Sequence, residues 1–316
     1  MRLLQTTIIT ITILFINALS AVYAQDEQTP EPTILKAVHD EGANTISIFR
    51  GNETDTLLIQ NSQEQIRPFI HPIHAPDGKG ILTEYRPDHH NTDHTHQTGL
   101  YWGLKRVNER DFFATCCKVG TTGYHQKVSA NVIRETGEEV SWQTVYDLLN
   151  EEGNTILTET QTWSMREEGE KYLIDLVWQG HANTDVTVAE FFVGGLFLRM
   201  QWYEGINGEV INAAGQRNQE AEHQRSIWAD VGIQVDGRDD LAHIAMFDHP
   251  DNNGFPITWR VDHQLGVGPS RQIMGDWSLD KGQTEVVRYR LVAYTGELDP
   301  DNLTRLWTEF AAKYEN

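Results

Sequence analysis

The sequence predicts an all-β protein, a single large antiparallel β-sandwich closed by a helix at its C-terminus. Segments of β-branched and aromatic residues recur along the chain in the two-residue period of half-buried strands. Turn-forming Gly, Asn and Asp separate these segments, and a convincing helical pattern occurs near the C-terminus. The sequence has no internal repeat or Pro/Ser-rich linker, so we expect residues 25–316 to form one domain.

The expected strands lie at residues 45–50, 140–146, 155–163, 172–178, 186–192, 196–202, 243–247 and 285–294. Hairpin turns are indicated by Gly153-Asn154 and by Asn207-Gly208. The helix is expected at residues 299–314, because Asp299 can cap it and Pro300 suits the first helical position. Its apolar side chains recur at helical spacing and predict a packing face: Leu303, Leu306, Trp307, Phe310, Ala311 and Tyr314.

The N-terminus has the pattern of a secretory signal peptide over residues 1–24. Arg2 precedes a mostly apolar run that ends near Leu19, and Val22-Tyr23-Ala24 offers a small-residue cleavage site. We therefore expect an exported protein, periplasmic or secreted, that begins at about Gln25. No later segment approaches the roughly 18 apolar residues of a membrane span.

The composition restricts the partners of the chain. Asp and Glu outnumber Lys and Arg by 46 to 25, for a net charge of -21. Nucleic acid is bound through Lys/Arg stripes, which this sequence lacks, so nucleic acid is excluded as a partner. Cys116 and Cys117 are adjacent and could pair only through a strained ring, so we interpret them as buried apolar residues. The oligomeric state does not follow from the sequence.

A histidine-rich segment is the strongest indication of chemistry. Six of the 13 histidines lie between residues 71 and 96, and histidine is the side chain that titrates near neutral pH and the commonest metal ligand. Prolines and glycines break this segment into loops, which predicts a loop-built polar site that includes Tyr85, Arg86 and Trp102. A solvated loop that is merely rich in histidine is the alternative. The six residues are His71, His74, His89, His90, His94 and His96.

Arg199 lies in the apolar segment 193–200. An arginine between apolar strand residues usually has an anionic partner. The sequence leaves two readings open, a structural ion pair or a clamp on a substrate carboxylate or sulfate.

Two strand segments carry further candidates. Trp228 and Asp230 share one face of a strand, which suits a sugar ring that stacks on the indole and donates to the carboxylate, although a core Trp beside an edge Asp is as consistent. Asp248 and His249 follow a strand and suit an acid/base pair or a turn cap. We expect His249 and the histidine segment to converge in one cleft, since each alone is poor in acid/base groups.

The ordered motifs resemble the family catalogued as PmoA-like, or methane-oxygenase-like. They are Arg67-Pro68-Phe69-Ile70-His71-Pro72, Asp93-His94-Thr95-His96, Gly99-Leu100-Tyr101-Trp102-Gly103, Gly194-Gly195 with Arg199, Trp228-Ala229-Asp230 and Phe247-Asp248-His249-Pro250. The resemblance covers the chain from about Arg67 onward. Members typically read Asp-His-Pro-His-His-Arg-Gly where this chain has Gln97 and Thr98, so the ligand set and the substrate are expected to have shifted.

The resemblance implies a sugar-mutarotase-type sandwich among exported proteins of bacterial polysaccharide degradation. More specifically, it implies an oligosaccharide dehydratase that acts on the non-reducing uronic acid of ulvan-type fragments. Arg86 or Arg199 could neutralise the carboxylate of such an anionic oligosaccharide, and a histidine from among His71, His94, His96 and His249 could remove the proton. Tyr85 or a second histidine could protonate the leaving oxygen.

Three classes of function therefore remain open in the sequence: a uronate dehydratase, a glycoside hydrolase or mutarotase with paired acid/base groups, and a non-catalytic sugar-binding sandwich in which Trp102, Trp228 and Trp259 stack on sugar. The sequence identifies no definite cofactor, and a divalent metal ion is a candidate. His94-x-His96 can place both rings on one strand face, which is a weak metal signal by itself.

Overall fold

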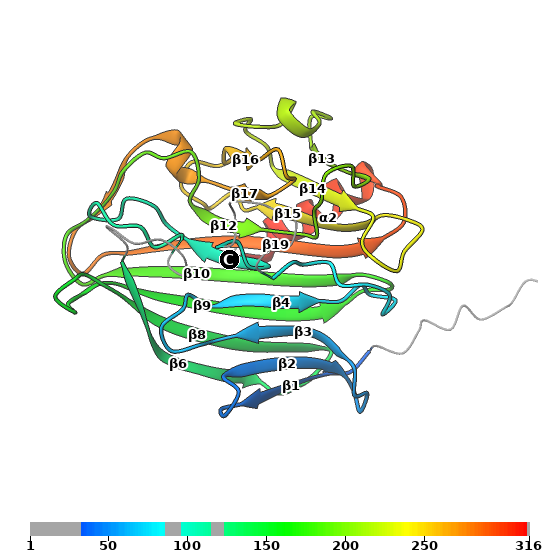
Figure 1. Ribbon diagram of the computed structural model, residues 1–316, viewed down its shortest axis with the longest axis horizontal. Helices are drawn as coiled ribbons and strands as arrows, with labels where there is room; N and C mark the ends of the chain where they lie inside the picture. The colour runs from blue at the N-terminus through cyan, green and yellow to red at the C-terminus, as the bar shows by residue number, and fades with distance from the viewer. Residues whose placement is uncertain (1–32, 86–95, 115–122, 315–316) are drawn as a thin grey trace, which may run out of the picture. The chain divides into compact units, whose positions relative to one another are not determined.

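Two large antiparallel sheets form the protein in the computed structural model, which describes residues 33–85, 96–114 and 123–314 (Figure 1). The described residues from Thr33 onward belong to one compact unit. All strand pairs between the named strands are antiparallel, so the predicted all-β sandwich with a C-terminal helix is confirmed.

The first sheet has nine strands. In spatial order they are β16 (Trp259–Val261), β17 (Val267–Pro269), β12 (Gly195–Leu198), β5 (Leu100–Gly103), β4 (Phe69–Ile73), β3 (Thr56–Asn61), β2 (Thr45–Arg50), β1 (Leu35–Asp40) and β7 (Thr136–Gly137). The second sheet has eight strands: β13 (Gly208–Asn212), β14 (Trp228–Ile233), β15 (Ala242–Asp248), β19 (Thr284–Thr295), β10 (Tyr172–Ala182), β9 (Thr155–Glu167), β8 (Glu139–Leu149) and β6 (Tyr124–Arg134). A two-stranded sheet pairs β11 (Val186–Val188) with β18 (Trp277–Leu279).

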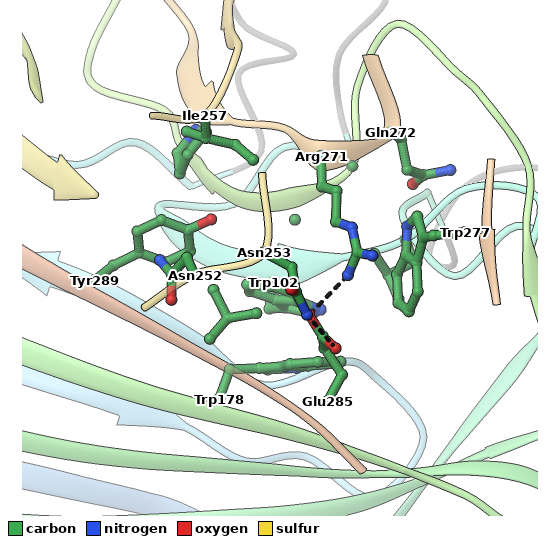
Figure 2. Close-up of a pocket in the computed structure, with 15 residues that line it drawn as sticks. Trp102, Trp178, Asn252, Asn253, Ile257, Arg271, Gln272, Trp277, Glu285 and Tyr289 are labelled. Atoms are coloured by element: carbon green, nitrogen blue, oxygen red, sulfur yellow. Dashed lines mark hydrogen bonds and ion pairs between the residues drawn. The ribbon is translucent and has the colours of Figure 1, made fainter. Parts of the chain in front are cut away.

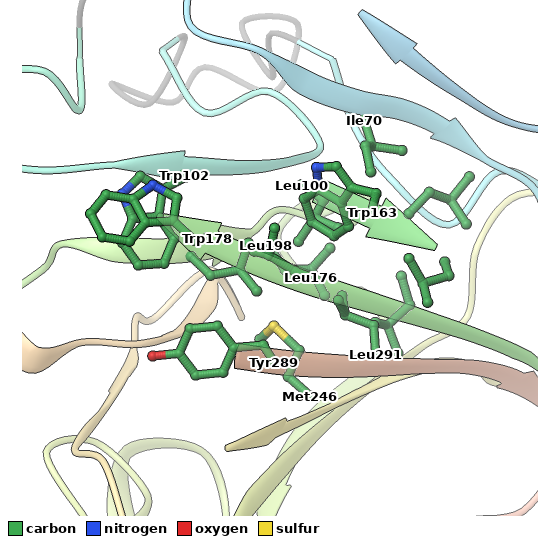
Figure 3. Close-up of a cluster of buried hydrophobic side chains, with 14 of the residues drawn as sticks. Ile70, Leu100, Trp102, Trp163, Leu176, Trp178, Leu198, Met246, Tyr289 and Leu291 are labelled. Carbon is green, nitrogen blue, oxygen red and sulfur yellow. The ribbon is translucent and has the colours of Figure 1, made fainter. Parts of the chain in front are cut away.

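The main core lies between the two large sheets. Every second side chain of β8 is buried, which is the period expected of a strand that covers a core with one face. Figure 3 shows Leu100 and Trp102 of β5 packed in one cluster with Leu176 and Trp178 of β10. Trp102 stacks on Trp178 with 4.3 Å between ring centroids.

Helix α2 (Pro300–Ala311) begins where the sequence predicts. The Asp299 carboxylate accepts a hydrogen bond from the Asn302 backbone N–H at 3.0 Å, and the 3₁₀ turn η3 (Ala312–Tyr314) continues the chain. Leu303, Leu306 and Phe310 pack on the outer face of the eight-stranded sheet. Because the helix covers that face, all described residues of β14 and β15 are buried on both sides.

Two predicted strands are shorter than expected. The segment 186–192 is a strand only to Val188, because Gln272 then replaces the strand partner. Its side-chain amide donates to the Ala189 carbonyl at 2.8 Å, and its backbone carbonyl accepts from the Phe191 N–H at 3.1 Å. The segment 196–202 is a strand only to Leu198. The short helices η1 (Asn218–Glu220) and η2 (Arg271–Met274) lie in connections.

Some sequence predictions fall outside the described residues, namely the signal peptide at 1–24 and the Cys116-Cys117 pair. Within the described part, no helix is long and apolar enough to cross a membrane.

Candidate functional site

The register of three neighbouring strands places the histidine motif and Arg199 on the outer face of the nine-stranded sheet. Ile70, Leu100 and Leu198 are paired across β4, β5 and β12 and point into the core. Since side chains alternate along a strand, their neighbours His71, Gly99 and Arg199 form a row on the opposite face. The adjacent row is aromatic and consists of Phe69, Tyr101 and Phe197.

Gly99 allows these strands to approach each other. Its φ is +60°, and a Cβ at this position would lie 2.3 Å from the Ile70 carbonyl oxygen. A side chain here would therefore push apart the strands that carry His71 and Arg199.

His71 and Tyr85 lie together on this face. Their rings stack with 5.6 Å between centroids, and His71 Nδ1 lies 3.0 Å from the Thr83 hydroxyl. Burial, reinforced by the neighbouring His74, lowers the pKa of His71 to about 4. His71 is thus neutral at neutral pH and a weaker base than an exposed histidine.

His96 is held over the aromatic row. It is 7% exposed, and its ring meets Phe113 edge-on at 6.0 Å. The Arg67 guanidinium donates to the carbonyls of both His96 and Phe113 and lies 3.8 Å above the Tyr101 ring. Arg67 therefore holds the loop of His96 and the loop of Phe113 against Tyr101 of the nine-stranded sheet.

A pocket of about 360 Å³ opens beside His96. Its wall is mainly aromatic, which suits the apolar face of a sugar ring. Among the described lining residues, its cations are Lys105, whose ammonium pairs with Asp111, and Arg260, whose guanidinium pairs with Glu222. The lining residues are His96, Gln97, Lys105, Phe113, Phe191, Phe192, Val193, Phe197, Arg260 and Asp262.

Arg260 keeps donors for a ligand. One of its nitrogens, Nη1, donates to Glu222, and its Cζ lies 5.4 Å from the ring centre of Phe192. Its Nε and Nη2 groups donate to no acceptor among the described residues. These two groups have the fork geometry that binds a carboxylate bidentately.

Arg199 is already paired. Its Nη2 lies 3.1 Å from the Asp262 carboxylate, its Nε donates to the Gln97 side-chain oxygen at 2.7 Å, and its Nη1 donates to the Gln264 carbonyl at 2.6 Å. Of the two readings of this arginine, the geometry matches a buried structural ion pair.

Trp102 points into the core instead of the pocket. Beside it lies a separate cavity of about 20 Å³, lined also by Trp178 and Tyr289 (Figure 2). This volume holds about one water molecule and no sugar. A larger hollow of about 730 Å³ lies beside Arg106 and Asp276, and none of the predicted site residues that the structure describes lines it.

Trp228 and Asp230 share a strand face as predicted, but α2 and the side chain of Tyr294 from β19 cover that face. The Trp228 indole donates to the Thr304 hydroxyl at 3.2 Å. The Asp230 carboxylate lies 2.7 Å from His243 Nδ1 and accepts from the Tyr294 hydroxyl at 2.9 Å. Both side chains are buried and bonded within the protein, which leaves no face for a sugar.

Asp248 and His249 lie at the end of β15, in the other sheet from His96. Asp248 accepts from the Asn252 amide and the Ile257 N–H at 2.7 Å each, and burial raises its pKa to about 7. The His249 ring packs edge-on against Phe310 at 5.0 Å, and burial lowers its pKa. His249 does not line the pocket of His96, so the structure does not bring the two histidines into the cleft expected from the sequence.

His94 and Arg86 lie outside the described residues. Within the described residues there is no group of three or more His, Cys, Asp or Glu side chains that could hold a metal ion. The metal prediction for His94 and His96 therefore stays a prediction.

Sequence reasoning missed Arg260 and gave Gln97 no role. The available signal for Arg260 was its position between two apolar residues, Trp259 and Val261, in a short strand. That is the same pattern that singled out Arg199. Phe191 and Phe192 were missed because they were assigned to a strand.

Fold and site together define an antiparallel β-sandwich protein with an aromatic pocket on the outer face of one sheet. A family model matches residues 53–308, so the chain belongs to the family described as "Family of unknown function (DUF6807)". This membership assigns no activity, and the PmoA-like resemblance stays a prediction. No curated protein matches the chain.

Several solved structures are similar in fold, each at 8% sequence identity. A GH36 alpha-galactosidase from Geobacillus stearothermophilus matches with a TM-score of 0.42 over 82% of this chain and 41% of its own. An alpha-galactosidase from Lactobacillus brevis matches with 0.35 over 89% and 42%, and a polysaccharide lyase with 0.32 over 88% and 34%. The chain thus spans less than half the length of these proteins, and similarities this weak leave its activity open.

Proposed function

We propose that the protein is a carbohydrate-active hydro-lyase that removes water from the non-reducing-end uronic acid of an oligosaccharide, such as an ulvan fragment. The observation that carries the proposal is the pocket beside His96. It combines an aromatic wall, a histidine and an arginine whose Nε and Nη2 are available to a carboxylate. The aromatic wall can stack on the sugar ring, the histidine can act as an acid or base, and the arginine can bind the uronate carboxylate.

The reaction forms a double bond between C4 and C5 of the uronate. A base takes the proton from C5, the electron pair of that C–H bond becomes the second C4–C5 bond, and the C4–O bond breaks. The leaving oxygen takes a proton from an acid and departs as water. The C5 proton is weakly acidic while the adjacent carboxylate is ionised. The site must therefore stabilise the negative charge of that carboxylate with a positively charged group.

Residues of the pocket, together with Tyr85 beside His71 on the same sheet face, suit these roles. Arg260 binds the substrate carboxylate through its two available nitrogens, in place of Arg199. His96 is the base, and the phenol of Tyr85 or a second histidine supplies the proton to the leaving oxygen. The aromatic side chains around Phe197 exclude water and hold the ring.

The test is a direct assay on defined oligosaccharides with a uronic acid at the non-reducing end. Elimination creates a conjugated unsaturated uronate, which absorbs in the ultraviolet, and we expect this absorbance to rise. New reducing ends without absorbance would show a glycoside hydrolase, anomer exchange alone a mutarotase, and binding without turnover a sugar-binding sandwich. Each of these outcomes would overturn the lyase proposal.

A variant pair tests the role of Arg260. Arg260→Gln should raise KM for the uronate substrate by roughly 10-fold or more, because a hydrogen bond to a charged group is lost. Arg134→Gln, at an exposed arginine outside the pocket lining, is the matched control and should behave like the wild type. Equal KM values in the two variants would remove Arg260 from the site.

We also propose that the chain is exported after cleavage behind Ala24. N-terminal sequencing of the protein recovered from outside the cytoplasm should then begin at about Gln25.

A further inference from the structure

Gln97 occupies an unusual position in the pocket beside His96. Its side chain is 96% buried (4% exposed) and yet lines the pocket. Arg199 donates to its side-chain oxygen through both Nε and Nη2. Because a guanidinium can only donate, the group that faces Arg199 must be the amide oxygen.

The amide nitrogen of Gln97 is therefore the group left for a ligand. Among the described residues, no acceptor takes a hydrogen bond from Nε2. Nε2 is not among the fully enclosed side-chain atoms that lack a partner, so it is open to the pocket, where a ligand oxygen can accept from its two N–H bonds. This N–H₂ group is thus an unpartnered donor pair in a pocket that also contains Arg260.

Asp262, which also lines the pocket, is the charged partner of Arg199. It lies 3.1 Å from Arg199 Nη2, and its Oδ1 accepts from the N–H groups of Gln264 and Gly266. Burial alone would raise the pKa of Asp262, but the charge of Arg199 and these N–H groups hold it below the usual value. Arg199 and Asp262 are therefore both charged and cancel each other, so the cluster presents no net charge to the pocket.

We infer that Gln97 is a specificity-determining residue that donates a hydrogen bond to an anionic oxygen of the sugar, and that Arg199 is a positioning residue that acts through it. Two hydrogen bonds on the amide oxygen polarise the amide and strengthen its N–H donors. The Arg199–Asp262 pair fixes the orientation, so the donors cannot rotate away. The inference rests on the proposed function for the identity of the anion, a hexuronate carboxylate.

Gln97→Glu tests the inference because it replaces the N–H₂ group with an oxygen and keeps the shape of the side chain nearly unchanged. A carboxylate at position 97 would still accept from Arg199, so the protein should fold, but it would present only acceptors to the pocket. Gln65→Glu is the matched control, since it makes the same change of charge at an exposed glutamine outside the pocket lining.

Binding is measured by calorimetry with two disaccharide probes, one ended by glucuronic acid and one by glucose. We expect Gln97→Glu to weaken the affinity for the glucuronate-ended probe by about 10- to 100-fold. The affinity for the glucose-ended probe should stay within about twofold of the wild-type value. Gln65→Glu should leave both unchanged. Arg199→Lys, which keeps the charge but loses the fork, should raise KM for the uronate with little change in kcat.

The outcomes separate this inference from the proposed function. Equal binding of the glucuronate probe by Gln97→Glu and wild type would overturn the role of Gln97, even if the protein is a lyase. Wild-type protein that binds the glucuronate probe through Gln97 but yields no unsaturated product would overturn the lyase and leave the role of Gln97 standing. Equal weakening of both probes would make Gln97 a general packing residue and overturn its role in specificity.

Discussion

Replacing Arg199 with Met should destabilise the protein strongly. Arg199 and Asp262 are 1% and 3% exposed as side chains and lie 3.1 Å apart. Met fills the volume of the arginine stem but leaves the Asp262 carboxylate without its countercharge. The oxygen of Gln97 and the carbonyl of Gln264 lose their donors at the same time.

The magnitude follows from this burial. Removing one partner of a buried ion pair costs about 3–5 kcal/mol, because the other charge remains desolvated. For a domain of this size, each kcal/mol lowers Tm by roughly 2 °C. Arg199→Met should therefore melt about 6–10 °C below the wild type.

Differential scanning calorimetry of Arg199→Met measures the effect, and the double variant Arg199→Met/Asp262→Asn identifies its cause. If the uncompensated charge is responsible, the double variant should regain about half of the lost Tm, since it carries no buried charge at either position. A single variant that melts within about 2 °C of the wild type would refute the buried-pair reasoning. It would show that Asp262 does not depend on Arg199 for its countercharge.

Three further predictions concern other buried groups. His96→Ala should fold, because the imidazole borders an open pocket and the Arg67 guanidinium bonds to the backbone carbonyl of His96, which Ala keeps. It should lose kcat by roughly 10²–10⁴ in the uronate assay; unchanged kcat would show that His96 is not the base. His249→Ala should keep activity and lose about 1–3 kcal/mol of stability in urea unfolding, because its ring packs on Phe310; a loss of activity without a loss of stability would return His249 to the site. Burial raises the pKa of Glu159 to about 7. Between the pKa of this carboxyl in the unfolded chain and about 7, the folded protein holds a proton that the unfolded chain has released. The free energy of unfolding therefore falls as pH rises through this range. Glu159→Gln should make urea stability fall less from about pH 5 to about pH 8, and an unchanged slope would contradict the raised pKa.

The fold could be predicted because its signals are local. Alternation along β8 and the cap and apolar spacing of α2 depend on residues close in sequence, and both were confirmed. The end of β11 at Val188 could not be predicted in this way. It depends on Gln272, which lies far along the chain and takes over the hydrogen bonds of the next strand residues.

The candidate site was harder to predict, because alternation shows which residues share a face but not what covers it. Trp228 and Asp230 do share a face, and the layer over it is α2 with Tyr294 of β19. Arg199 and Arg260 have similar apolar flanks, yet all three guanidinium nitrogens of Arg199 donate within the described part of the protein, whereas two of Arg260 do not. The partners that separate them, such as Asp262 and Glu222, are set by tertiary contacts.

The negative net charge of the chain repels the anionic substrate proposed for it, whereas the pocket donors attract that substrate. The salt dependence of the affinity should separate these two effects. A net charge of -21 repels a uronate at long range, but this repulsion is screened beyond about 8 Å at 0.15 M salt and about 3 Å at 1 M. The donors of Gln97 and Arg260 act within hydrogen-bond distance, where salt screens little. Affinity for a glucuronate-ended disaccharide should therefore stay constant or increase as salt is raised, while the glucose-ended control stays constant. Affinity that falls steeply with salt would mean that binding depends on exposed charge elsewhere on the surface, and the pocket beside His96 would no longer account for recognition of the anion.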